Sequence, residues 1–405
     1  MSRFTPYQRR LFAVLSIATF FEGYDFIALS QILPNLRVEF ALSEAEGGFI
    51  ASVISLGTIV SYLLVRMADR WGRRAVLLLT ITGYAVFTLL SGLSRGALDF
   101  AAYQFAARIF QIAQWAVGMI FAAEEFPAGR RAFVLGVIQA SNALGVVACA
   151  AVVPFLLDAA FGWRTVYFVG VLPILLVPYA ARHIRESARF ERHTGEMPVI
   201  DTRPFAIFRT PYRGRVIQMA LVWGLTYMST NTALLFWKEF AVAERGFSDH
   251  DVGQAVVFAS VAALPFVFSV GRLIDHLGRR RSAALLYSVG IAAVVLAYQL
   301  HDFWALTACL MVALVASIGL LTTLNALTTE LFPTSMRADA FSWANNLLGR
   351  IGYVIAPGVV GAAAAQWGWS TAVPLTGISL LAALAIIHVF IPETAGRELE
   401  DAAQL

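Results

Sequence analysis

The chain has 405 residues, of which 59% are hydrophobic and only 14% are charged. A soluble domain usually carries about 25% charged residues, so this composition excludes an ordinary soluble protein and indicates a chain built for a lipid bilayer. The formal net charge is only +4 and the arginines gather between apolar runs, a pattern that marks membrane orientation and excludes nucleic acid as the partner.

Apolar runs long enough to cross a bilayer recur along the whole chain. A membrane-spanning helix needs roughly 20 apolar residues. The first run is too long for a signal peptide and lacks a cleavage site, so we expect it to remain as a helix. Both cysteines lie inside apolar runs, which favours small buried residues over a disulfide. The sequence predicts twelve spans, near residues 11–34, 46–66, 75–95, 98–123, 132–156, 164–183, 214–237, 252–272, 282–300, 303–329, 338–362 and 369–391.

The first span contains two carboxylates, Glu22 and Asp25, within "FFEGYDF". A charged side chain at the centre of a membrane helix costs about 2.5–3.5 kcal/mol or more, so it is rarely retained without a function. Residues three apart lie on one face of a helix. We therefore interpret both acids as candidates for proton binding at a single site.

Arginines cluster at the start of the chain and in the loop after every second span, whereas the alternate loops are acidic or neutral. Cytoplasmic loops of membrane proteins carry the excess of Lys and Arg. This asymmetry predicts that both termini are cytoplasmic. We further expect a multi-pass monomer in a bacterial-type inner (plasma) membrane.

Two short patterns each occur twice, with one common offset. "ADRWGRR" begins at Ala68 and "IDHLGRR" at Ile274, while "EEFPAGRR" begins at Glu124 and "ELFPTSMR" at Glu330; each pair is 206 positions apart. Two unrelated patterns that share an offset indicate an internal duplication. We predict two six-helix halves, 1–183 and 214–392, with a cytoplasmic linker, 184–213, and a cytoplasmic tail, 393–405.

These repeated patterns resemble those of the major facilitator superfamily, over essentially the whole chain. The resemblance implies an all-α membrane protein with twelve transmembrane helices in two six-helix halves, which rock around a substrate bound midway through the membrane. "EGYDF" and "SMRADAFSWANNLLGRIG" resemble aromatic-acid:proton and metabolite:proton symporters, whereas "RESARF" and "PETAGRELE" resemble the ends of the halves in sugar porters.

The same resemblance implies a cytoplasmic gate made from the charged loop residues. In the family, these acids and arginines bond across the two halves and hold the cytoplasmic side shut. The alternative is that the arginines only orient the chain. The matching positions are Asp69, Arg70, Arg73, Glu124 and Arg131 in the first half, and Asp275, Arg279, Glu330 and Arg337 in the second.

Depth along the helices pairs the acids of the first span with polar residues of the fourth. At 1.5 Å per residue, Asp25 lies ~21 Å from the cytoplasmic end of its helix and Arg108 lies ~22 Å from the same side. Glu22 falls level with Gln111 by the same reasoning. Because burial and a neighbouring arginine act in opposite directions on a carboxyl group, such a site can exchange protons near physiological pH. A fixed structural ion pair between Asp25 and Arg108 is the alternative.

The expected substrate site combines arginines, amides and aromatic rings from both halves. Arg350 lies ~20 Å along its span, near mid-depth, and one guanidinium from each half would suit a carboxylate bidentately; helix packing is the alternative role for Arg350. Singly, the rings are typical of packing or interfacial anchors, but together they favour a substrate with a ring. The candidates are Tyr24, Arg108, Gln111, Gln114, Trp115, Trp223, Tyr227, Trp343, Asn345, Asn346 and Arg350.

The sequence therefore predicts a transporter and no enzyme, with neither catalytic residues nor a metal or other cofactor. The expected activity is proton-coupled symport of a small organic anion, an aromatic or hydroxylated carboxylate, by alternating access. A sugar:proton symporter and a proton-driven exporter of amphipathic compounds are the alternatives.

Overall fold

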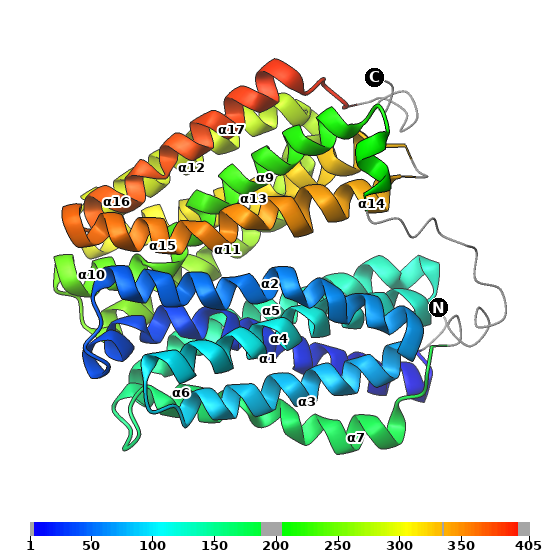
Figure 1. Ribbon diagram of the computed structural model, residues 1–405, viewed down its shortest axis with the longest axis horizontal. Helices are drawn as coiled ribbons and strands as arrows, with labels where there is room; N and C mark the ends of the chain where they lie inside the picture. The colour runs from blue at the N-terminus through cyan, green and yellow to red at the C-terminus, as the bar shows by residue number, and fades with distance from the viewer. Residues whose placement is uncertain (1–3, 188–204, 334–335, 396–405) are drawn as a thin grey trace. The chain divides into compact units, whose positions relative to one another are not determined.

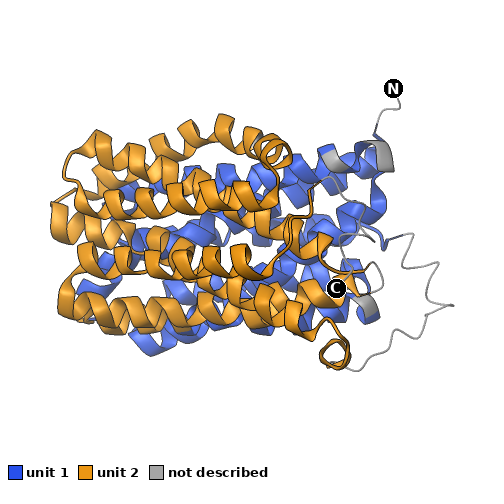
Figure 2. Cartoon of the chain, turned by 90° about the horizontal axis from the view of Figure 1, so that it is seen from above, with its two compact units in different colours: residues 1–40, 53–200 blue, residues 41–52, 201–405 orange. Residues whose placement is uncertain are grey.

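The computed structural model describes residues 4–187, 205–333 and 336–395. It divides into two compact units, shown in different colours in Figure 2: unit 1, residues 1–40 and 53–200, and unit 2, residues 41–52 and 201–405. Residues 41–52, which the predicted first half contains, are therefore assigned to unit 2. The predicted linker and tail fall largely outside the described residues.

Unit 1 is a bundle of long helices in which α1 packs on α5 and α3 packs on α4 (Figure 1). Its apolar core brings together the N-terminal half of α1 with residues of α3, α4 and α5. The helices that lie wholly or mostly in unit 1 are α1 (Pro6–Glu39), α2 (Glu44–Trp71), α3 (Arg73–Gly92), α4 (Ala97–Glu125), α5 (Ala128–Leu157), α6 (Arg164–Gly170), the 3-10 turn η1 (Leu172–Leu175) and α7 (Leu176–His183).

Unit 2 repeats this plan, with α12 packed on α13, and α9 in contact with α15 and α17. A second apolar core lies between these helices. The elements of unit 2 are η2 (Ala206–Arg209), α9 (Arg213–Leu235), α10 (Trp237–Arg245), α11 (Asp249–Leu277), α12 (Arg279–Gln299), α13 (Phe303–Glu330), α14 (Arg337–Phe341), the π-helix η3 (Ser342–Gly349), α15 (Arg350–Trp367), α16 (Trp369–Leu375) and α17 (Gly377–Phe390).

The predicted all-α fold with membrane-spanning helices is confirmed. Eleven helical segments of the described chain are long and apolar enough to cross a membrane. The predicted seventh span, α9, is 23 residues long and is not among the eleven because it carries more polar side chains. Two of these, Thr226 and Thr230, are buried and donate to carbonyl oxygens one turn earlier, which satisfies hydroxyl groups that would be costly to bury alone.

The glycine of the first loop motif, which occurs once in each unit, is required by its backbone conformation. Gly72, between α2 and α3, has φ 93°, and Gly278, between α11 and α12, has φ 83°. Residues with a side chain rarely adopt this left-handed region. The repeated glycine therefore allows each pair of helices to be joined by a single residue.

Unit 1 also contains a very close contact between two helices. A Cβ atom built on Gly23 of α1 would lie 2.0 Å from the carbonyl oxygen of Asn142, and one built on Gly145 of α5 would lie 1.8 Å from that of Phe20. Small residues let membrane helices approach backbone to backbone. This contact fixes the rotation of α1, and with it the direction of the acids in that helix.

Candidate functional site

The two acids of α1 are buried within unit 1. Glu22 is 6% exposed and Asp25 is 2% exposed. The carboxylate oxygen Oε2 of Glu22 accepts a hydrogen bond of 2.6 Å from Nδ2 of Asn142, and the backbone carbonyl of Glu22 accepts one of 2.9 Å from Nε2 of Gln111. Gln111 therefore lies level with Glu22, but it binds the backbone, while the carboxylate is bound by an amide of α5.

Asp25 and Arg108 interact only across a gap. Among the described residues, no ion pair within 4.0 Å joins them, so the alternative of a fixed, direct ion pair is wrong for this structure. Oδ1 of Asp25 and Nη1 of Arg108 are both buried without a hydrogen-bond partner in the described chain. The guanidinium lies over the ring of Phe26, with Cζ 5.3 Å from the ring centre. The two charged groups thus keep unused hydrogen-bonding capacity.

The remaining candidates of unit 1 have mixed surroundings. Gln114 is 2% exposed and its Oε1 has no partner among the described residues. Trp115 is 37% exposed, and its Nε1 donates to Oε1 of Gln139 at 3.1 Å. The hydroxyl of Tyr24 donates to the carbonyl of Val166, so Tyr24 links α1 to α6.

Arg350 lies between two tyrosine rings of unit 2. Its Cζ is 4.9 Å from the ring centre of Tyr227 and 5.3 Å from that of Tyr353, and these rings are nearly perpendicular, at 89°. Among the described residues, no carboxylate pairs with Arg350 and no acceptor binds its N–H groups. Aromatic faces stabilise a cation, but they leave its hydrogen-bond donors available to an anion.

The structure brings together only some of the other candidates of unit 2. Oδ1 of Asn345 accepts a hydrogen bond of 2.8 Å from the hydroxyl of Tyr227. Trp223 is 1% exposed and donates to Thr328, which indicates packing, although its ring lies 5.3 Å from that of Tyr227. Trp343 instead contacts Phe208 of η2 and Phe205, the residue before η2. The adjacent Asn346 is part-buried.

The charged loop residues of unit 1 form a network at the start of α3. Nη2 of Arg73 pairs with Oε1 of Glu124 at 3.0 Å. Glu124 also accepts a short hydrogen bond from the hydroxyl of Ser187. The carboxylate of Glu186 accepts hydrogen bonds from the backbone N–H groups of Arg73 and Arg74. A negative charge at a helix N-terminus is favourable because the exposed N–H groups there carry partial positive charge.

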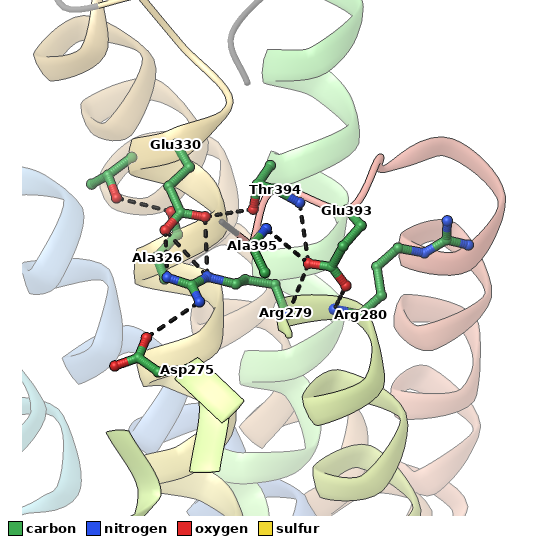
Figure 3. A network of polar contacts seen from close by, with 9 residues as sticks. Asp275, Arg279, Arg280, Ala326, Glu330, Glu393, Thr394 and Ala395 are labelled. Atoms are coloured by element: carbon green, nitrogen blue, oxygen red, sulfur yellow. Dashed lines mark hydrogen bonds and ion pairs between the residues drawn. The ribbon is translucent and has the colours of Figure 1, made fainter. Parts of the chain in front are cut away.

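Unit 2 repeats this network around Arg279, as Figure 3 shows. Arg279 pairs with Glu330 at 2.8 Å and with Asp275 at 3.2 Å. The hydroxyl of Thr394 donates to Glu330 at 2.5 Å, and Glu393 accepts from the backbone N–H groups of Arg279 and Arg280. In unit 1 the segment after α7 therefore binds the N-terminus of α3. In unit 2 the segment after α17 binds the N-terminus of α12 in the same way.

Each ion pair that the structure describes in these networks joins residues of one unit, so bonding across the halves stays a prediction. Arg70 is exposed, and the Nε atoms of Arg131 and Arg337 are buried without partners in the described part of the chain. The side chain of Asp69 lies outside what the structure describes.

Sequence reasoning missed several residues of these networks and of the site. Glu186 and Ser187 match Glu393 and Thr394 at an offset of 207, close to that of the loop motifs. This offset is a signal that could have found them. Asn142 begins "NALG", which echoes "NLLG" at Asn346. This repeat does not reveal the contact with Glu22, because that contact depends on how α5 packs on α1.

Glu393→Gln is expected to destabilise unit 2 by about 1 kcal/mol, the usual contribution of a helix N-terminal cap. Burial raises the pKa of the Glu393 carboxyl, but the backbone N–H groups of Arg280, Arg279, Ala395 and Thr394 outweigh burial and hold the pKa below its ordinary value. Because the folded-state pKa is depressed, this stabilisation is present at neutral pH and is lost as pH falls through that pKa.

Thermal unfolding in detergent as a function of pH measures this effect. The difference between wild type and Glu393→Gln should be clear at pH 7 and should shrink in acid. Asp158→Asn, which neutralises an exposed carboxylate after α5, is the matched control and should change little. A constant difference at all pH values would contradict the assigned role.

Buried charges in membrane-spanning helices mark substrate and ion pathways, so the fold and the site together define a membrane transporter. The chain belongs to the Major Facilitator Superfamily, whose sequence profile matches residues 15–349 and, in a second match, residues 219–404. The twelve-helix fold of two halves follows from this membership. The protein is therefore a multi-pass transporter and not an enzyme. Among the described residues, no cluster of His, Cys, Asp or Glu could hold a metal ion.

Several named proteins are similar to the chain over almost its full length. A putative niacin/nicotinamide transporter, NiaP, of Bacillus subtilis is 26% identical, over 97% of this chain and 98% of that protein. The 4-hydroxybenzoate transporter PcaK of Pseudomonas aeruginosa is 24% identical, over 96% and 93%. The crystal structure of a D-xylose-proton symporter has a TM-score of 0.78 at 18% identity, over 96% and 99%, and so shares the fold.

Proposed function

We propose that this protein is a proton-coupled symporter of a small organic anion, an aromatic or hydroxylated carboxylate, in the inner membrane of a bacterial cell. In this proposal the anion binds to Arg108 and Arg350, and the proton binds to the acids of α1. Alternating access of the two halves moves both across the membrane.

The observation that carries this proposal is the environment of Arg350. Its guanidinium is stabilised by the faces of Tyr227 and Tyr353, yet no carboxylate of the described chain neutralises it. An uncompensated cation within a membrane helix is costly. A carboxylate substrate would neutralise the charge and use the planar N–H donors bidentately, whereas a sugar would leave the charge uncompensated.

Unit 1 supports the coupling to protons. Glu22 and Asp25 are both nearly inaccessible, and Oδ1 of Asp25 has no partner among the described residues. A carboxyl group with a free oxygen, close to but not bonded to a guanidinium, can gain or lose a proton without breaking a direct ion pair. Arg108 then senses the charge of Asp25 across the gap, which provides the linkage that symport requires.

The relatives support an acid substrate. The similar protein of Pseudomonas aeruginosa is named as a transporter of 4-hydroxybenzoate, and that of Bacillus subtilis as a putative transporter of niacin or its neutral amide, nicotinamide. Of these compounds, 4-hydroxybenzoate and niacin each join a carboxyl group to an aromatic ring. The likeness to the xylose symporter, at 18% identity, concerns the fold alone.

A ligand screen followed by transport assays tests the proposal. Purified protein should be stabilised in thermal shift by nicotinate, benzoates, shikimate-like acids or dicarboxylates, and not by sugars. The best acid should then accumulate in proteoliposomes under an inward proton gradient, and a protonophore should abolish the accumulation. Stabilisation by sugars alone would overturn the anion substrate, and accumulation that survives the protonophore would overturn the coupling.

Arg350→Lys is expected to weaken binding of the acid about tenfold while the protein still folds, because lysine keeps the charge but loses the bidentate fork. The neutral amide of the same compound should bind wild type and variant almost equally. Equal weakening of acid and amide would show that Arg350 is a packing residue.

A further inference from the structure

The eleventh span is interrupted by a π-helix. Residues Arg337–Phe341 and Arg350–Trp367 are α-helical, and the eight residues between them, Ser342–Gly349, are π-helical. π-helices are rare and mostly a single turn long, and they occur frequently at functional sites. The segment contains no proline, so tertiary contacts have to account for it.

Close packing on α9 holds this segment in place. A Cβ atom on Gly349 would lie 2.7 Å from the Cβ of Trp223, and one on Gly352 would lie 2.1 Å from the carbonyl oxygen of Gly224. Only glycine allows backbones to approach so closely. The contact fixes the rotation of η3 and of the first turn of α15 against α9.

The π-helical geometry brings two polar residues to one tyrosine. Asn345 and Arg350 are five positions apart, which is the i→i+5 spacing of a π-helix, so they lie on the same side. The hydroxyl of Tyr227 donates to Asn345 at 2.8 Å, and Cζ of Arg350 lies over the Tyr227 ring. In an α-helix of 3.6 residues per turn, the two would point roughly 140° apart.

Tyr353 completes a corner around the guanidinium. The centres of the Tyr227 and Tyr353 rings are 5.7 Å apart, and both rings are more than nine-tenths buried. Their faces cover part of the guanidinium and offer it no carboxylate. The guanidinium of Arg350 thus lies against two rings, and one of these rings is bonded through its hydroxyl to Asn345.

We propose that η3 is a positioning device for the substrate carboxylate, in which Asn345 acts through Tyr227 and not on the substrate. The π-helix places Asn345 where it fixes the Tyr227 hydroxyl, and the fixed ring holds Arg350 with its N–H edge toward an acid. The site thereby selects a carboxylate over its neutral amide. This inference rests on the proposed function, because it takes the substrate to be an acid.

Binding of an acid and its amide to hydroxyl and amide variants tests the proposal. The first probe pair is nicotinate and nicotinamide, replaced by the tightest acid of the ligand screen and its amide if that acid binds better. Tyr227→Phe and Asn345→Ala should each weaken binding of the acid about tenfold and leave binding of the amide unchanged. The double variant should be no weaker than either single variant, because both remove the same hydrogen bond.

Tyr298→Phe is the matched control, since it also removes a buried tyrosine hydroxyl that donates to a carbonyl, at 2.8 Å, elsewhere in unit 2. It should lower stability without changing the preference for the acid. Additive losses in the double variant would show that Asn345 contacts the substrate itself. Equal losses of acid and amide, or no loss at all, would overturn the positioning role. If wild type binds no acid of the screen, the proposed function fails before these variants are compared.

Discussion

Arg108→Ala is expected to abolish binding of the acid, whereas Asp25→Asn should leave binding intact and abolish accumulation. Removing Arg108 leaves the buried carboxylates Glu22 and Asp25 without their nearby cation, so an incoming anion meets only like charge. The pair that is lost is the one between Arg108 and the substrate carboxylate. Loss of one partner of a buried charge pair costs about 2–5 kcal/mol, which is a loss of affinity of roughly 30-fold or more.

Asp25→Asn acts differently because it removes a proton site but no substrate donor. The neutral amide leaves Arg108 free at every pH, so exchange of substrate across the membrane should continue with little pH dependence. Accumulation driven by a proton gradient should disappear. If Glu22 carries the proton, then Glu22→Gln should show this phenotype instead, and the hydrogen bond from Asn142 to Glu22 would identify Asn142 as its positioning residue.

Proteoliposome counterflow, measured beside gradient-driven uptake, separates these outcomes. Counterflow shows that a variant is folded and binds substrate, and Arg95→Ala, which removes an exposed arginine between α3 and α4, controls for loss of a charge. If both carboxylate variants still accumulate substrate against its gradient, the acids of α1 are structural.

Gly145→Ala is expected to destabilise unit 1 by about 3 kcal/mol or more, at the upper end of the usual cost of overpacking. The added Cβ would lie 1.8 Å from the carbonyl oxygen of Phe20 and 2.8 Å from the backbone nitrogen of Tyr24. Neither atom can move without shifting the backbone of α1. The two helices must therefore separate, which also withdraws Asn142 from Glu22.

Gly136→Ala on the same helix is the matched control, because a Cβ there meets nothing within 4 Å. Alanine is a better helix former than glycine by about 1 kcal/mol, so this variant should be neutral or slightly more stable. Thermal unfolding of the two variants in detergent measures the difference. Similar stabilities would show that α1 and α5 do not depend on this close approach.

The fold was largely predictable from the sequence because a bilayer restricts what a chain can do. Every backbone polar group in hydrocarbon has to be satisfied within the chain, so a long apolar run has to be a helix. The exceptions have local causes. The predicted span 164–183 is divided around η1, which contains Pro173, and α9 is less apolar than its length suggests. The repeated patterns predicted the duplication, which the matching networks around Arg73 and Arg279 reproduce.

The candidate site was only partly predictable, because residue depth is a property of sequence and side-chain direction is not. Depth along the helices placed Gln111 level with Glu22. Depth could not show that Gln111 binds the backbone of Glu22, or that Asp25 and Arg108 stop short of a direct ion pair. Those outcomes depend on the rotation of α1 and α4 about their axes.

The sequence alone therefore determined the membrane class, the spans, the internal repeat and the identity of the charges within the membrane. Only the tertiary structure decided which groups meet those charges: Asn142 at Glu22, two tyrosine faces at Arg350, and Asn345 behind Tyr227. The physical reason is that helix formation in lipid follows from local composition, whereas the rotation of a helix follows from close contacts between segments far apart in the chain. The glycine contacts of α1 with α5 and of α9 with α15 set those rotations.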